Sequence, residues 1–238
     1  MKWYYLMLDL LSISFPLIRS FEPKIRFSSK WKFLFPGMLI AGLVYIPWDI
    51  WFTVEGIWGF NQDYLLGITF LHLPLEEWLF FIVIPYACFF IFEVSVYFFK
   101  LKEFKTAPVY HGLIALALLV LGYRHMEHTY TSIACWGAAL SLLIANVVIR
   151  QARWSYFWAM YGISLVPFLI VNGALTGSFT EKPVVWYNNT ENSGVRLGTI
   201  PIEDSVYLLF YLLLIFMVYE TLYMRSLNKS NKSNTLEG

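Results

Sequence analysis

Charged residues are scarce in this sequence. Of its 238 residues, 14% are charged and 58% are hydrophobic, whereas a soluble domain carries about 25% charged residues. The formal net charge is +1, so we predict no basic surface and no nucleic-acid partner. The scarcity of charge indicates that the solvent is lipid, and the lipid bilayer is the first partner that we expect.

Motifs for disulfides, metals and nucleotides are also missing. The two cysteines, Cys88 and Cys135, lie in apolar runs without metal-ligand spacing, which favours small core residues. His125 and His128 flank Glu127, but three candidate ligands in one loop are weak evidence, and we predict no metal. Because no phosphate loop, dinucleotide fingerprint or nucleophile motif occurs, we expect no cofactor.

Long apolar runs, in contrast, are abundant. A helix that crosses a bilayer needs about 20 mostly apolar residues. Seven segments come close to this requirement: residues 3–18, 33–52, 74–99, 109–123, 131–149, 156–172 and 201–224. We therefore predict an all-α integral membrane protein with seven transmembrane helices.

Basic residues alternate across these spans. The loops after the first, third and fifth spans, together with the tail, hold thirteen of the seventeen Lys and Arg residues, and the other side holds four. The positive-inside rule then places the N-terminus outside and the C-terminus in the cytoplasm. We expect a multi-pass protein of the plasma membrane, the inner membrane of the cell.

An internal repeat divides the chain. The segment LPLEE at 73–77 recurs as IPIED at 200–204, an offset of 127, and Asp49 matches Asn172 at an offset of 123. Each half contains three spans, so the fourth span is needed to make the two halves parallel, with an axis along the membrane normal. We predict a first repeat over 1–107, a linking helix over 108–127, a second repeat over 128–227 and a disordered tail over 228–238.

Each copy of the motif carries two adjacent acids, Glu76 and Glu77 in the first and Glu203 and Asp204 in the second. Either pair alone would be interpreted as helix-start acids that follow a proline and offset the helix dipole. Their repetition favours catalysis, because ionisable residues inside a membrane are rare and usually functional. Two close, poorly solvated carboxyls cannot easily both ionise. We therefore predict an acid that donates a proton beside a carboxylate that takes one back.

Aromatic side chains follow the acids at helical spacing. Phe80 and Phe81 come after the first pair, and Tyr207 and Tyr211 come after the second. Aromatic faces stabilise a nearby cation, so we predict that these four rings contact the substrate. The alternative is that each ring only packs against its neighbours.

Two polar residues end spans on the same side as the acid pairs. We predict that Asp49 and Asn172 are partners of the acids and contribute to substrate binding, although Asp49 could instead face water. Glu93 and Glu220 lie near the opposite interface, where ordinary solvation is the expected explanation.

Residues 73–93 (LPLEEWLFFIVIPYACFFIFE), 172–177 (NGALTG) and 200–204 (IPIED) resemble the small membrane lycopene cyclases. That family occurs as two subunits in some bacteria and as a fused chain in archaea and fungi. Residues 1–107 correspond to one subunit (the c half) and residues 128–227 to the other (the d half). Asp204 departs from an all-glutamate pattern.

The resemblance implies a cofactor-independent enzyme that cyclises the linear ends of lycopene, or a related carotenoid, to γ-carotene or β-carotene. Our hypothesis for the mechanism makes Glu203 or Glu76 the proton donor and Asp204 or Glu77 the proton acceptor. Self-association stays open, as does whether two ends use one site or two.

Two alternative functions stay open. Parallel three-helix halves with one linking helix are also the layout of small-solute transporters, and a carotenoid hydratase would use the same protonation. A retinal protein is disfavoured, because its last helix needs a lysine and residues 201–224 contain none.

Overall fold

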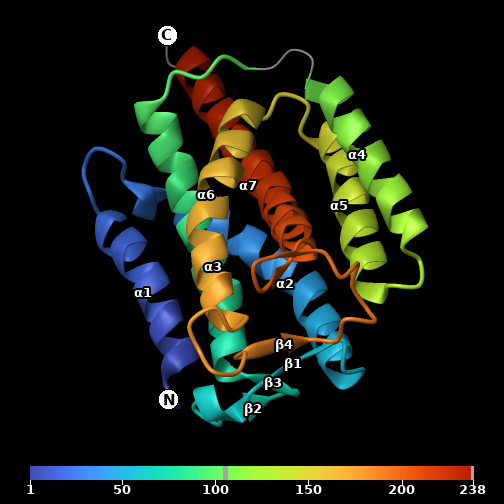
Figure 1. Cartoon of the computed structure of the whole chain (residues 1–238). Coiled ribbons are helices and arrows are strands. Elements are labelled where there is room, and N and C mark those ends of the chain that lie inside the picture. The colour runs from blue at the N-terminus through green and yellow to red at the C-terminus, as the bar shows by residue number, and fades with distance from the viewer. Residues whose placement is uncertain (104–106, 237–238) are drawn as a thin grey trace.

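The computed structural model describes residues 1–103 and 107–236, with side chains described over residues 1–103 and 108–229 (Figure 1). Within these residues the chain forms seven α-helices. They are α1 (Tyr4–Arg19), α2 (Trp31–Val54), α3 (Leu75–Phe98), α4 (Ala107–Arg124), α5 (Thr129–Val148), α6 (Trp154–Leu175) and α7 (Glu203–Leu236).

Five of these helices are long and apolar enough to cross a membrane, namely α2, α3, α5, α6 and α7. α4 is apolar but shorter, and α1 has 16 residues. The protein is therefore an all-helical membrane protein, and the count of seven spans stays a prediction.

Apolar side chains face outward and acidic side chains face inward, as expected for a protein that is surrounded by lipid. Large apolar side chains such as Leu39 and Val147 are about two-thirds exposed, which is unfavourable in water but not in hydrocarbon. Conversely, many acids are buried in the bundle: Asp9, Asp49, Glu76, Glu77, Glu93, Glu203, Asp204 and Glu220.

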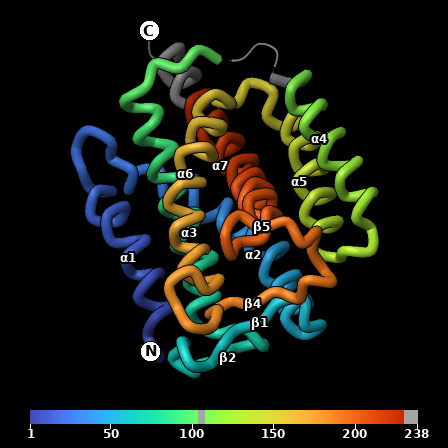
Figure 2. Tube along the Cα trace, viewed as in Figure 1, coloured from blue at the N-terminus to red at the C-terminus, as the bar shows by residue number. Residues whose placement is uncertain are grey.

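The two halves exchange one helix each. α1 packs on α3 and α5 packs on α7, but α2 packs mainly on α7 and α6 on α3 (Figure 2). The close approach of α2 to α7 depends on Gly37, because a Cβ atom there would lie 2.9 Å from the Ile215 carbonyl oxygen. The repeats are thus interleaved, and neither half has a bundle of its own.

Short strands close the end of the bundle that carries both acid motifs. β1 (Trp58–Phe60) pairs antiparallel with β4 (Val185–Tyr187). Two small hairpins lie beside this pair, β2 (Thr69–Phe70) with β3 (Leu73–Pro74), and β5 (Arg196–Leu197) with β6 (Ile200–Pro201). Two 3₁₀ turns, Phe27–Lys30 and Gln62–Tyr64, complete the connections.

The strands β1 and β4 are related by the same internal repeat as the helices. Gly59 pairs with Trp186, and these residues are 127 apart, the offset of the acid motifs. A pseudo-twofold axis therefore passes through this pair. No side chain fits at Gly59, because a Cβ atom there would overlap the Trp186 ring.

The C-terminal segment differs from its prediction. α7 continues to Leu236, so Asn228–Leu236, predicted as a disordered tail, is helical. Residues 237 and 238 lie outside the described residues.

Candidate active site

The first acid of each pair ties down the loop that precedes its own helix. A Glu76 carboxylate oxygen accepts a 2.7 Å hydrogen bond from the Leu66 amide, and Glu203 accepts a 2.7 Å bond from the Ser193 amide. Leu66 and Ser193 are again 127 apart. Glu203 also accepts a 2.6 Å bond from Thr131. These two acids therefore have a similar loop-holding role in the two halves.

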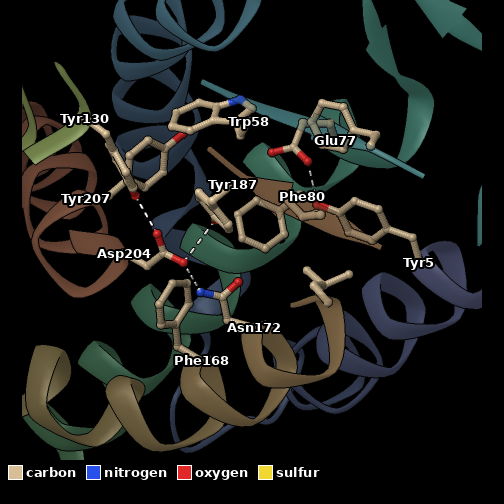
Figure 3. Close-up of a pocket in the computed structure, with 13 residues that line it drawn as sticks. Tyr5, Trp58, Glu77, Phe80, Tyr130, Phe168, Asn172, Tyr187, Asp204 and Tyr207 are labelled. Carbon is tan, nitrogen blue, oxygen red and sulfur yellow. Dashed lines mark hydrogen bonds between the residues drawn. The ribbon is translucent and has the colours of Figure 1, made fainter. Parts of the chain in front are cut away.

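The second acid of each pair faces a shared cavity. Glu77 and Asp204 line one small cavity of about 40 Å³, from opposite sides (Figure 3). Both acid motifs therefore lie at the same end of the bundle, as a parallel repeat requires. A cavity of this volume has room for only a few water molecules.

The two cavity carboxyls have different hydrogen-bond partners. Glu77 accepts one side-chain bond, 2.7 Å long, from Tyr5. Asp204 accepts three, from Tyr130 at 2.6 Å, Asn172 at 2.6 Å and Tyr187 at 3.0 Å. More donors stabilise the charged form of a carboxyl, so the two acids occupy distinct electrostatic surroundings.

Aromatic rings form most of the cavity wall. Trp58, Phe60, Phe80, Phe168 and Tyr207 line it together with the tyrosines that bind the acids. The Trp58 ring lies 5.2 Å from Tyr130 and 6.0 Å from Tyr207, both edge-on. Such a wall presents aromatic faces to any cation formed inside.

Comparison with known proteins decides the family. The family model described as "Lycopene cyclase" matches residues 2–95 and 127–222, which is most of the chain. The chain belongs to the lycopene cyclase family. No curated protein and no solved structure matches the chain.

The two segments matched by the lycopene cyclase family are the two repeats, and α4 lies between them. The resemblance predicted from the acid motifs is thus confirmed, together with the internal repeat. Membership assigns the chain to carotenoid cyclisation in a membrane, with a carotenoid as substrate.

Within this lycopene cyclase, three of the predicted binding residues line the cavity: Phe80, Asn172 and Tyr207. Phe81 and Tyr211 do not. They are buried nearby, where the Tyr211 hydroxyl donates a 2.8 Å bond to the Phe81 carbonyl. These two residues join α3 to α7.

Asp49 also lies outside the cavity wall. Its side chain is 1% exposed, so the alternative that it faces water is wrong. It accepts a 2.6 Å bond from the Trp58 indole, which does line the cavity. Asp49 therefore orients a wall residue.

Three tyrosines of the site were not predicted. Tyr5 and Tyr130 bind the two acids from the first helix of each repeat. They are 125 residues apart, so neither repeat offset, 123 or 127, pairs them. Tyr187 comes from β4, and no local pattern marks it. Burial and the nearby Asp204 carboxylate raise the pKa of Tyr187 well above its usual range. The hydroxyl therefore stays neutral and donates a hydrogen bond to Asp204.

Glu93 and Glu220 are not solvated, so that prediction was wrong. They are 5% and 0% exposed at the opposite end of the bundle. Arg153 lies between them, 2.5 Å from Glu220 and 3.6 Å from Glu93. A buried carboxylate requires such a partner, and Tyr219 gives Glu93 a further bond of 2.6 Å.

Metal ligation finds no support in the geometry. Among the residues that the structure describes, no three His, Cys, Asp or Glu side chains come together in a group that could hold an ion.

Proposed function

We propose that this protein is a lycopene β-cyclase that closes end groups by acid–base catalysis without redox change. The observation that supports it most is the shared cavity, in which Glu77 from one repeat faces Asp204 from the other. A single aromatic-walled site with two carboxyls suits a reaction that adds one proton and removes another.

The hydrogen bonds suggest which acid does what. Asp204, with three donors, is the carboxylate, and Glu77, with one, carries the proton. This assignment keeps Asp204 as acceptor but replaces Glu76 or Glu203 as donor, because those two acids are tied to loop amides.

The reaction balances as an isomerisation. Glu77 gives its proton to the terminal double bond of the linear end, which leaves a tertiary cation. The neighbouring alkene attacks that cation, so a carbon–carbon bond closes a six-membered ring and the charge moves onto the ring. Asp204 then removes the adjacent ring proton, which restores a double bond and gives the β-ionone ring.

The surroundings of the cation decide the product. Aromatic faces of Trp58, Tyr207 and Phe80 stabilise it. The small cavity keeps out water that would trap the cation as an alcohol. Proton transfer back to solvent then occurs at the outer face of the plasma membrane, with the N-terminus outside and the C-terminus in the cytoplasm.

The test is pigment chromatography after expression in bacteria that accumulate lycopene. We expect γ-carotene and β-carotene. When isolated membranes receive unlabelled lycopene in deuterated water, we expect one deuterium per ring, because the donated proton exchanges with solvent. A hydroxylated carotenoid would indicate the hydratase instead. Unchanged lycopene, with the protein present in the membrane, would contradict the proposal.

A further inference from the structure

α1, α3 and α6 enclose a second, larger cavity beside the acid site. It is an apolar groove of about 550 Å³, open toward the membrane. Leu11, Phe15 and Ile170 stand at its rim and are each more than half exposed, while Ala87 and Ile91 form its floor on α3. We call this the α1–α6 groove.

The groove continues from the acid cavity along the same helix faces. On α1, Tyr5 lines the cavity, and Leu8 and Ser12 line the groove at i+3 and i+7. On α3, Glu77 and Phe80 line the cavity, and Ile84 lines the groove at the next turn. The three helices thus carry one continuous surface from the acids toward the membrane interior.

Phe168 on α6 marks the boundary, because its ring lines both spaces. Each of the three helices contributes groove residues seven positions apart, which is about 10 Å of helix. The groove is therefore a channel about two helical turns long that ends at Phe168.

We propose that the α1–α6 groove holds the polyene chain of the carotenoid and delivers one end group past Phe168 to Glu77 and Asp204. This rests on the proposed cyclase function. The occupant follows from continuity: a long apolar molecule whose end reacts in the acid cavity needs an apolar path from the bilayer. The end group enters the acid cavity beside Phe168, which lines both spaces.

The position that corresponds to Phe168 in the other half is filled. At the repeat offset of 123, Tyr45 takes the place of Phe168. Tyr45 is 0% exposed, its ring lies 4.4 Å from Tyr211 and 5.1 Å from Trp48, and its hydroxyl binds the Tyr207 carbonyl. Aromatic side chains fill that position, so among the described residues we place the entrance on the α1–α6 side.

The first test fills the groove. Ala87→Trp places a large ring on its floor, and we expect conversion of lycopene to fall by about 100-fold, because the end group no longer reaches the acids. Ala117→Trp is the matched control, since Ala117 is exposed on α4, away from the groove. Both variants are compared at equal amounts of membrane-inserted protein.

The second test does not depend on turnover. A diazirine-bearing amino acid replaces Phe15 in a Glu77→Gln background, in membranes that contain lycopene, with Tyr110 on α4 as the control position. We expect a covalent adduct of lycopene mass at position 15 and none at position 110. This measurement decides the matter if Ala87→Trp fails to fold.

The outcomes separate the two proposals. If the unmodified protein cyclises lycopene, the groove proposal is overturned by full activity in Ala87→Trp, by a phospholipid adduct alone at position 15, or by a crosslinked second copy of the chain. If the unmodified protein does not cyclise lycopene, the proposed function fails, while a lycopene adduct at position 15 would still support the groove.

Discussion

Tyr187 shows how a single side chain can set the charge of the site. It is the one donor to Asp204 that comes from a loop strand, and it stacks on Tyr130, another donor, at 6.0 Å and 14°. Because it lies outside the helices, its position depends on the pairing of β1 with β4. Tyr187 therefore links the pairing of these two strands to the hydrogen bonds of Asp204, the acceptor that we propose.

Removing this hydroxyl should slow the reaction without unfolding the protein. Tyr187→Phe keeps the ring but deletes a hydrogen bond to a charged group, which is worth about 1.5–3 kcal/mol. We expect turnover of lycopene to drop by about 10- to 100-fold, measured in membranes by chromatography. Tyr123→Phe, exposed on α4, is the control. Equal rates in both variants would show that Tyr187 does not act on Asp204.

The acid residues were predictable from their repetition, but their separate roles were not. Glu76 and Glu77 are adjacent, and nothing local says that Glu77 faces the cavity while Glu76 binds a loop amide. That difference follows from helical rotation of about 100° per residue combined with the packing of α6 on α3. A single sequence shows the helical rotation, but it does not show how α6 packs on α3.

At the scale of elements, hydropathy placed all seven helices within a few residues of their observed bounds, apart from the end of α7. The short strands β1 to β6 were not predicted, because two- and three-residue strands leave no periodic pattern. The exchange of α2 and α6 between halves was also not predicted, since lipid-facing and helix-facing residues are equally apolar in this chain.

The β1–β4 pair should tolerate no added side chain at its centre. Gly59→Ala would drive a Cβ atom into the Trp186 ring, and overpacking of this kind costs about 1–3 kcal/mol. We expect at least a severalfold loss of cyclase activity. The double variant Gly59→Ala/Trp186→Ala should recover part of it, because the clashing ring is gone. Gly162→Ala, with open space on α6, is the control. Full activity of Gly59→Ala would argue against a closing role.

Arg153 should stabilise the opposite end of the bundle. Burial opposes its charge, but the carboxylates of Glu220 and Glu93 outweigh this and raise the pKa of Arg153. Its guanidinium also lies 4.1 Å from the Tyr223 ring centroid. The arginine therefore stays charged and joins both repeats.

Arg153→Ala would leave Glu93 and Glu220 buried without a cation. Breaking a buried pair in this way costs about 3–5 kcal/mol, so we expect a clear drop in the melting temperature of the detergent-solubilised protein. Arg150→Ala, exposed three residues earlier, should melt like the unmodified protein. Addition of Glu220→Gln to Arg153→Ala should recover part of the loss. Identical melting of the two arginine variants would contradict this role.

At the scale of the whole molecule, we propose that the two repeats share one site. Lycopene has two ends, so under this proposal a molecule cyclised at one end leaves and returns reversed. With purified protein in lipid discs and excess lycopene, we expect γ-carotene to dominate early and β-carotene to follow. Direct appearance of β-carotene without free γ-carotene would show that both ends react during one stay.

Whether Glu77 and Asp204 serve one site is tested most directly by their single variants, Glu77→Gln and Asp204→Asn. Each is expressed where lycopene accumulates, with exposed Glu127→Gln as control, and pigments are separated by chromatography. Because both acids act on the same end group, each variant should lose about 10²- to 10⁴-fold in ring formation and make neither γ-carotene nor β-carotene. Ample γ-carotene from either variant would show that each acid serves its own end, and would contradict a shared site.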